Sequence, residues 1–191
     1  MRFERTDGLE LTPLLEHPEA LPTVSRWLQR EWMHHYGRTL SDTRAEVRTR
    51  LNRHDLPMAW VARVGRAVVG TVSISADARA AQTHSLWCLA GLYVNARWRR
   101  RGIGGLMCAA AISKARELGM PTLGLYTQER EAYFARQGWQ AQGIVSVELS
   151  GELQLVTRMV LSLDATALRE DEPAEQGARV KCGKRAHASS M

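Results

Sequence analysis

Cysteine is scarce in this 191-residue sequence, and Cys88, Cys108 and Cys182 lie far apart with no Cys-x-x-Cys pair. An odd number of isolated cysteines gives no disulfide framework and suits a reducing cytoplasm. His84 and Cys88 lie near each other, but two further metal ligands at suitable spacing are missing. We therefore expect a cytoplasmic protein without a bound metal, with Cys88 and Cys108 as small apolar core residues.

Long apolar runs are also missing. The longest extends from Leu106 to Ile112, far short of the roughly 20 residues that a membrane-spanning helix needs. The first residues, Met-Arg-Phe-Glu-Arg, lack the apolar region of a signal peptide. The sequence predicts neither a membrane span nor a membrane partner.

Lysine is rare, although the net charge is +6. Only three of the 26 basic residues are lysines, and this skew indicates a codon bias of the source more than a phosphate-binding face. Since no nucleic-acid-binding motif accompanies the charge, we expect no nucleic-acid partner.

The sequence does not match either of two common nucleotide-binding motifs. In a dinucleotide fingerprint that starts at Gly102, the third glycine would fall on Met107. A P-loop requires Gly-Lys followed by Ser or Thr, but Gly183-Lys184 precedes Arg185. The sequence therefore favours neither a dinucleotide site nor an NTPase.

What the sequence does contain is a strand, a cationic glycine-rich loop and a helix in succession, between Ala90 and Leu118. Glycines allow the backbone to approach a ligand closely, and the free N–H groups of a helix N-terminus favour an anion. Neighbouring arginines add positive potential. This layout predicts a cradle for a pyrophosphate.

Hydrophobic periodicity predicts a mixed α/β order. We expect helices at 20–36 (ending before Gly37), 42–52 (with Ser41 as N-cap), 106–118 and 129–137. Strands are expected at 9–15, 58–64, 67–76, 86–94, 121–127, 140–149 and 152–163. Residues 1–163 are expected to form one domain. Residues 164–191, in which apolar residues thin out, are expected to form a polar, disordered tail.

Two motifs support a family resemblance. Arg99-Arg100-Arg101-Gly102-Ile103-Gly104 fits the coenzyme A loop pattern (Gln/Arg)-x-x-Gly-x-(Gly/Ala), and Tyr133-Phe134 before Gly138-Trp139 fits a second, downstream motif. On these residues the chain resembles the GNAT acyl-CoA N-acyltransferases, over about residues 9–163. His17-Pro18-Glu19, Glu31-Trp32 and Trp87 resemble one bacterial subgroup. The resemblance implies one α/β (α+β) domain: a mixed, mostly antiparallel twisted sheet flanked by helices, with a V-shaped opening between two central parallel strands.

The same resemblance implies acetyl-CoA as co-substrate. Its pantetheine arm would pair with the backbone at 92–94, its pyrophosphate would lie on the N–H groups of 100–105, and an N–H near Ala90 and Gly91 would polarise the thioester carbonyl. The residues implied to bind it are Leu92, Tyr93, Val94, Arg99, Arg100, Arg101, Gly102, Ile103, Gly104, Gly105, Phe134 and Arg136.

The catalytic residues follow less directly. Many relatives use a tyrosine four residues before the glycine as proton donor to the thiolate, but that position holds Phe134. Tyr133 is the neighbouring candidate, either as an acid in a shifted register or as a core residue. A thiolate can also leave without a donor, because thiol pKa values lie near 8.5.

No acidic residue lies in the predicted strand 86–94, where many relatives carry a glutamate base. The candidates for the general base are Glu31, His34, His35, Asp77 and His84, although the sequence favours a solvated surface group as the interpretation of each. A water relay is an equal alternative. Trp32 and Trp87 are candidates to line an acceptor pocket.

The expected function is acetyl transfer from acetyl-CoA to a primary amine of a small molecule, by direct attack in a ternary complex. The alternatives are a non-catalytic acyl-CoA-binding sensor and a protein or peptide N-acetyltransferase. The protein is expected to be a monomer or a homodimer.

Overall fold

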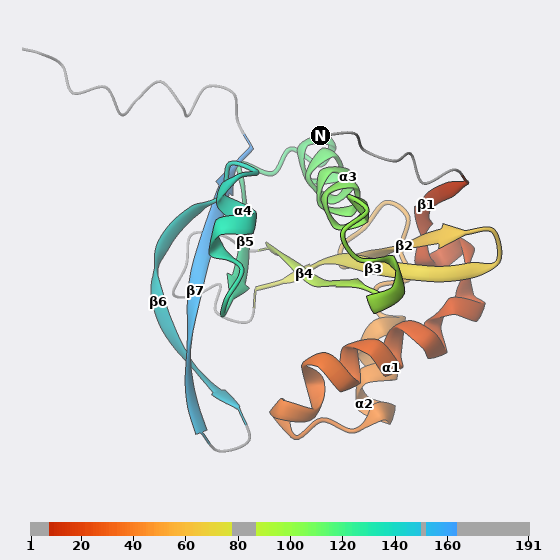
Figure 1. The fold of residues 1–191 in the computed structure, drawn as a ribbon, viewed down its shortest axis with the longest axis horizontal. Helices are drawn as coiled ribbons and strands as arrows, with labels where there is room; N and C mark the ends of the chain where they lie inside the picture. Colours follow the sequence, from red (N-terminus) through yellow and green to blue (C-terminus); the bar gives the residue numbers. More distant parts are fainter. Residues whose placement is uncertain (1–7, 78–86, 150–151, 164–191) are drawn as a thin grey trace, which may run out of the picture.

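The computed structural model describes residues 8–77, 87–149 and 152–163. Seven strands form one sheet in the order β1-β2-β3-β4-β5-β7-β6, and every neighbouring pair is antiparallel except β4 and β5. Figure 1 shows the strong twist between the β1–β4 half of the sheet and the β5–β7 half. The predicted mixed, mostly antiparallel fold is confirmed.

The elements occur in the expected order. The strands are β1 (Leu9–Pro13), β2 (Met58–Val64), β3 (Ala67–Ala76), β4 (Trp87–Val94), β5 (Thr122–Thr127), β6 (Gln140–Leu149) and β7 (Glu152–Ser162). The α-helices are α1 (Leu21–Glu31), α2 (Leu40–Arg48), α3 (Ile103–Glu117) and α4 (Glu131–Ala135). Short 3₁₀ helices are η1 (Leu14–Glu16), η2 (Pro18–Ala20), η3 (Met33–Tyr36) and η5 (Ala96–Trp98).

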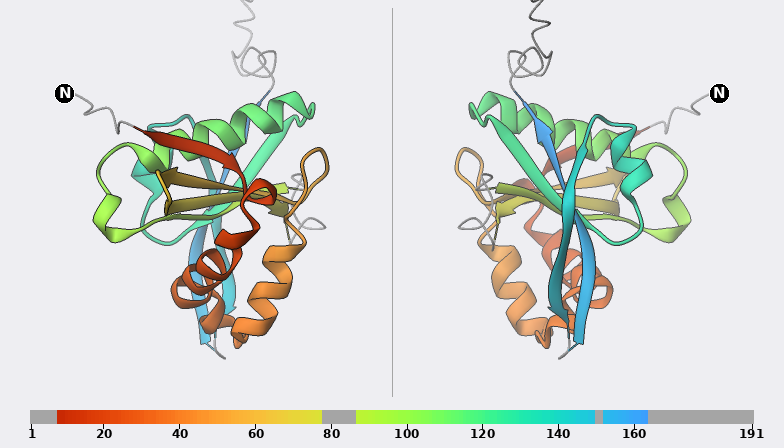
Figure 2. Two further views of the ribbon diagram at one scale, coloured as in Figure 1. Left: turned by 90° about the vertical axis from the view of Figure 1, so that its right-hand side faces the viewer. Right: turned by 90° about the vertical axis from the view of Figure 1, so that its left-hand side faces the viewer.

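Helices cover both faces of the sheet. In both views of Figure 2, α3 crosses one face while α1 and α2 lie on the opposite one. The alternation along β2 explains this arrangement, because successive side chains of a strand point to opposite faces. Met58, Trp60 and Ala62 join the core under α3, whereas Ala59 and Val61 join the core under α1 and α2.

Helix α3 presents one apolar stripe to the larger core. Ile103, Met107, Ala111 and Ala115 are each at most 1% exposed and recur every four residues, as expected for a core-facing stripe. Cys108 is fully buried beside this stripe, and Cys88 is 6% exposed on β4. Both cysteines are therefore core residues, as predicted.

Several predicted boundaries were wrong. The helix predicted over 20–36 stops as α1 at Glu31, because Trp32 leaves helical geometry, and the chain continues as η3 to Gly37 (φ 64°). The N-cap of α2 is Thr39 instead of Ser41. Thr39 and Asp42 form a capping box, in which each side chain accepts the other residue's backbone N–H. The helix predicted from Leu106 begins three residues earlier, at Ile103, and α4 is shorter than the predicted 129–137.

Some predictions fall outside the described residues, among them the polar tail at 164–191, the 150–151 turn and His84. Among the described residues, no helix is long and apolar enough to span a membrane. In the same part of the chain, no cluster of three or more His, Cys, Asp or Glu side chains could hold a metal ion.

Candidate active site

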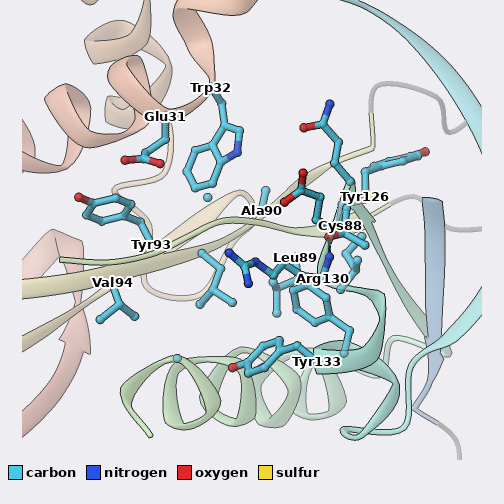
Figure 3. A pocket seen from close by; sticks show the side chains of 18 of the residues that line it. Glu31, Trp32, Cys88, Leu89, Ala90, Tyr93, Val94, Tyr126, Arg130 and Tyr133 are labelled. Atoms are coloured by element: carbon cyan, nitrogen blue, oxygen red, sulfur yellow. Dashed lines mark hydrogen bonds between the residues drawn. The ribbon is translucent and has the colours of Figure 1, made fainter. Parts of the chain in front are cut away.

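A cleft of about 1570 Å³ opens where β4 and β5 part. The two strands pair in parallel register only at Cys88 and Gly124. Beyond this point they diverge, so backbone groups of β4 that a neighbouring strand would otherwise bond face the cleft (Figure 3). The V-shaped opening expected between two central parallel strands is therefore present.

A β-bulge shapes β4 along this cleft. Thr71 pairs with Tyr93 and Ser73 with Ala90, so Gly91 and Leu92 together oppose the single residue Val72. Gly91 has a φ of +59°, which glycine adopts without strain. A Cβ at Gly91 would also approach the Leu28 side chain to 3.1 Å. The bulge therefore requires glycine and turns the backbone toward the cleft.

The loop after β4 leads into the N-terminus of α3. Arg100 has a φ of +62° and Gly102 a φ of +79°, so two nearby residues adopt left-handed geometry. Such geometry in a residue other than glycine is uncommon and is found preferentially at functional sites. The first intrahelical bond runs from the Leu106 N–H to the Gly102 carbonyl, which leaves the preceding N–H groups free for an anion.

Arginine side chains around this loop are held by aromatic rings. The Arg99 guanidinium lies 5.7 Å from the Tyr93 ring centre, and its Nε donates to the Val94 carbonyl at 2.9 Å. The Arg101 guanidinium lies 4.9 Å from the centre of the Trp98 ring. We call residues 91–105 the glycine wall of the cleft. It combines free N–H groups with positive charge.

A second wall comes from the end of α1 and from η3. Glu31, Trp32, Met33, His35 and Tyr36 line the cleft, and we call residues 31–36 the aromatic wall. Trp32 and Tyr36 are 37% and 50% exposed, so both rings keep apolar surface open to a ligand. Figure 3 shows Glu31 and Trp32 on one side of β4 and Tyr133 on the other, next to α3.

A profile of the acetyltransferase (GNAT) family matches residues 21–139, more than half of the chain. The chain belongs to the GNAT acetyltransferase family. No curated protein sequence matches it significantly.

Solved structures agree with this family. An N-acetyltransferase from Staphylococcus aureus is 16% identical, with a TM-score of 0.64 over 82% of this chain and 99% of that one. The Salmonella typhimurium protein yncA, solved with its cofactor acetyl-CoA, is 16% identical, with a TM-score of 0.63 over 84% of this chain and 97% of that one. An aminoglycoside 6'-N-acetyltransferase complexed with coenzyme A is 14% identical, with a TM-score of 0.62 over 81% of this chain and 97% of that one. At these identities, the likeness shows the GNAT fold.

The structure brings the residues predicted to bind acetyl-CoA together around one cleft. All of them line it except Arg101, which packs on Trp98. The Tyr93 ring packs against Trp27 with 4.9 Å between ring centres, and its hydroxyl accepts a hydrogen bond from Arg30 at 3.0 Å. These contacts hold the side chain of Tyr93 against α1, so its backbone is available to a ligand in the cleft. A Cβ at Gly105 would meet nothing within 4 Å, so space for a ligand lies against this turn. The donor set of N–H groups and guanidiniums fits a pyrophosphate.

Tyr133 lies against the first turns of α3. Its hydroxyl would be 3.0 Å from a Cβ at Gly104, and burial raises its pKa above the ordinary value of 10.0, with a further contribution from Cys108. The phenol therefore stays protonated at neutral pH. Phe134 is 8% exposed and packs edge-on against Trp139, with 6.1 Å between ring centres. Tyr133 thus remains the candidate acid, and Phe134 contributes an apolar surface.

The candidate bases separate by position. Glu31 and His35 line the cleft. His34 is bonded through Nδ1 to the Gln29 carbonyl at 3.0 Å, and its ring stacks on that of His35. Asp77 is buried and accepts two bonds of 3.1 Å from the Tyr126 hydroxyl. Burial and, after it, the neighbouring Asp77 carboxylate raise the pKa of Tyr126. Of the two predicted carboxylates, therefore, only Glu31 lines the cleft.

Several residues that line the cleft were not predicted from the sequence, among them the charged residues Arg50, Glu129 and Arg130. Glu129 and Arg130 lie in the short loop between β5 and α4, where polar residues are ordinary and carry no signal. Figure 3 shows the Arg130 side chain extending into the cleft beneath β4. Arg50 follows α2, and its side chain reaches the cleft next to Gly91 of β4. The only hint in its sequence is the i, i+4 pair with Glu46.

Proposed function

We propose that this protein transfers an acetyl group from acetyl-CoA to a primary amine of a small molecule, by direct attack in a ternary complex. The single observation that carries the proposal is the cleft itself. Its glycine wall offers free N–H groups and arginines, whereas its aromatic wall offers a carboxylate and exposed rings. The glycine wall therefore suits an anionic co-substrate and the aromatic wall an amine.

Acetyl-CoA, when bound, supplies the activated acetyl group as a thioester. The residues proposed to hold it are those of the glycine wall, with Phe134 and Arg136. The N–H groups at the start of α3 bind the pyrophosphate, and the arginines neutralise its charge. The unpaired edge of β4 bonds the pantetheine arm as an added strand would, which aligns the acyl carbonyl with the bulge. The enzyme thus acts chiefly by positioning.

The amine must lose a proton to attack. We assign this proton to Glu31, directly or through water, because Glu31 is the predicted carboxylate that lines the cleft. Trp32 and Tyr36 favour an acceptor that is cationic or carries a ring, since aromatic faces attract cations and stack on flat groups. At the other side of β4, the Tyr133 hydroxyl donates a proton to the leaving sulfur. Such a reaction belongs in the cytoplasm, and the buried thiols of Cys88 and Cys108 suit a reducing compartment.

The test is thiol release from acetyl-CoA with mass spectrometry of the products. The acceptors are polyamines, aminoglycosides, amino acids, dipeptides and a lysine peptide. Acetylation of one class of small amine supports the proposal. Acetylation of the lysine peptide alone would instead indicate a protein acetyltransferase. Tight acetyl-CoA binding with no transfer to any acceptor would contradict the proposal and favour a non-catalytic acyl-CoA sensor, for which Phe134 at the usual tyrosine position is the motivating observation.

A further inference from the structure

Arg50 is a charged residue buried inside the wall of the cleft. It is 4% exposed and lies just after α2, in the chain that leads to β2. Burial lowers the pKa of its guanidinium, and the charge of Glu46 opposes this effect. Burying an arginine costs free energy unless its N–H groups are hydrogen-bonded. The hydrogen-bond partners of Arg50 therefore indicate which part of the structure it stabilises.

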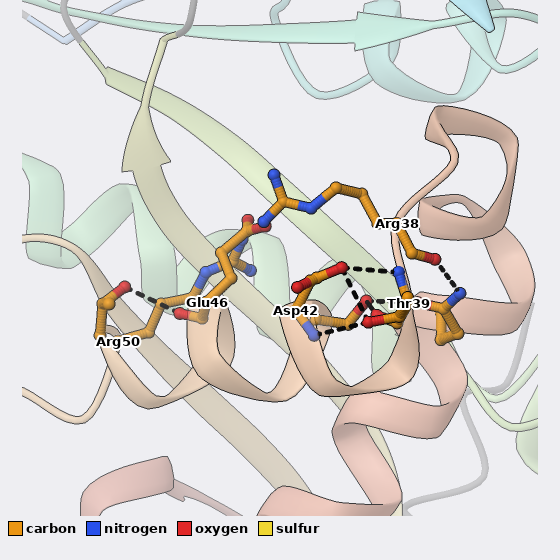
Figure 4. A network of polar contacts seen from close by, with 8 residues as sticks. Arg38, Thr39, Asp42, Glu46 and Arg50 are labelled. Atoms are coloured by element: carbon orange, nitrogen blue, oxygen red, sulfur yellow. Dashed lines mark hydrogen bonds and ion pairs between the residues drawn. The ribbon is translucent and has the colours of Figure 1, made fainter. Parts of the chain in front are cut away.

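The partners of Arg50 connect α2 to the bulge of β4. Nη2 donates to Glu46 Oε1 at 2.5 Å, and Glu46 also lies 3.6 Å from Arg38 (Figure 4). Nη1 donates to the Ser73 hydroxyl at 2.9 Å, and that hydroxyl donates to the Ala90 carbonyl at 2.9 Å. A continuous chain of bonds thus runs from a guanidinium to the backbone just before the bulge. Such chains polarise each member and strengthen one another.

The guanidinium also lies directly behind the bulge. Arg50 Nη1 would be 3.7 Å from a Cβ at Gly91, and Ser73 Oγ 3.6 Å. Arg50 is at the same time among the residues that line the cleft. Its positive charge is therefore next to the backbone that faces the acyl carbonyl in the proposed complex. Negative charge that develops on that carbonyl would be stabilised by fixed donors and by a nearby cation.

We propose that Arg50 is a positioning residue for acyl transfer: through Ser73 it holds the Ala90 carbonyl and fixes the Gly91 bulge so that its N–H groups polarise the thioester. This inference rests on the proposed binding of acetyl-CoA in this cleft. A purely structural Arg50 would anchor α2 to β3 and would affect stability alone. The two roles differ in what happens to the bound carbonyl.

The experiment is infrared spectroscopy of [1-¹³C]acetyl-CoA bound to the whole chain, which reports the strength of the carbonyl bond without any acceptor. Wild type is compared with Arg50→Met, Ser73→Ala and the control Arg48→Met. Arg48 is an exposed arginine at the end of α2. We expect the bound carbonyl to absorb at lower frequency than free acetyl-CoA in wild type and Arg48→Met. In Arg50→Met and Ser73→Ala the band should return toward the free value.

With an acceptor, kcat should fall about 100-fold in Arg50→Met, because misplacing reacting groups by about 1 Å costs this much. Ser73→Ala should lose about tenfold, as expected for one hydrogen bond. Affinity for acetyl-CoA should change less than about threefold in both, because the polarising interaction is weak in the bound ground state and becomes stronger as charge develops in the transition state. Ser73→Ala removes only one buried oxygen, so it provides the test if Arg50→Met does not fold.

The outcomes separate the two proposals. A wild-type protein that does not bind acetyl-CoA would remove the proposed function itself. A wild-type protein that binds acetyl-CoA with an unshifted carbonyl band, or variants with a wild-type band and a lowered melting temperature, would overturn the role of Arg50 while leaving the function intact.

Discussion

The glycine wall and the aromatic wall of the cleft are built on different principles. The glycine wall works through its backbone: a bulge at Gly91, left-handed residues at Arg100 and Gly102, and free N–H groups at the start of α3. The aromatic wall works through side chains carried by the end of α1, by Trp32 and by the short 3₁₀ segment η3. Backbone recognition requires particular residues, chiefly glycine, at fixed spacing, and therefore leaves a motif. Side-chain recognition can be met by many sequences, and therefore leaves little trace.

The largest expected effect concerns the glycine wall. Gly102→Val places a β-branched residue at φ +79° at the N-terminus of α3. We expect acetyl-CoA affinity to fall at least about 100-fold, because the N–H groups lose their arrangement around the pyrophosphate. Isothermal titration calorimetry measures this.

The matched control is Gly119→Val, at the opposite end of the same helix. Gly119 has a φ of +68° and open space around it, so the backbone strain is similar but lies far from the loop. Both variants should lower the melting temperature, whereas only Gly102→Val should lose acetyl-CoA. An equal loss of affinity in both variants would mean that strain, and not the cradle, determines binding.

A second prediction concerns the proton donor beside the glycine wall. Tyr133→Phe should lower kcat by about 10-fold to 100-fold and leave acetyl-CoA affinity unchanged, because thiolates are good leaving groups and need only modest help. Since the pKa of Tyr133 is raised above its ordinary value of 10.0, the acid should stay mostly protonated well below that pH. Steady-state kinetics between pH 7 and about 9 should therefore show no alkaline decline attributable to this group.

The double variant Tyr133→Phe with Phe134→Tyr moves the phenol by one position along α4. Recovery of kcat would show that a phenol in either register can serve. Wild-type kcat in Tyr133→Phe alone would instead make Tyr133 a packing residue against Gly104 and Cys108.

A smaller effect is expected on the aromatic wall. Trp32→Ala should raise the KM for the acceptor about threefold to tenfold, the contribution of one aromatic contact, and leave the KM for acetyl-CoA unchanged. Trp98→Ala removes the ring that packs on Arg101, so it should raise the KM for acetyl-CoA and leave the KM for the acceptor unchanged. Steady-state kinetics with both substrates varied measures both. If either variant changed both constants equally, the two walls would not act independently.

Glu31→Gln tests the proton acceptor of the aromatic wall with the least disturbance of shape. We expect kcat/KM for the acceptor to fall at neutral pH and to recover in part at higher pH, where more of the amine is already neutral. A pH–rate profile checks this. An unchanged profile would assign proton removal to water or to another group.

The difference between the walls also explains what could be predicted from the sequence. The order of helices and strands follows from helical spacing and from apolar, β-branched runs, whereas the arrangement of the sheet and the proposed cofactor loop follow from the family resemblance that the glycine motif supports. Helix ends were less accurate: Thr39 and Ser41 are both good N-cap residues, and only the bond between Thr39 and Asp42 decides between them. Arg50 could not be placed, because its burial depends on how α2 packs behind Gly91, which no local pattern encodes.

Amide hydrogen exchange of the whole chain, with and without acetyl-CoA, tests the central claim most directly, since it reports the backbone N–H groups themselves. We predict protection of residues 92–94 and 100–105, with residues 31–36 of the aromatic wall unchanged until an acceptor is added. Protection at 31–36 on acetyl-CoA addition, with exchange at 100–105 unaffected, would contradict the assignment of the glycine wall to the co-substrate.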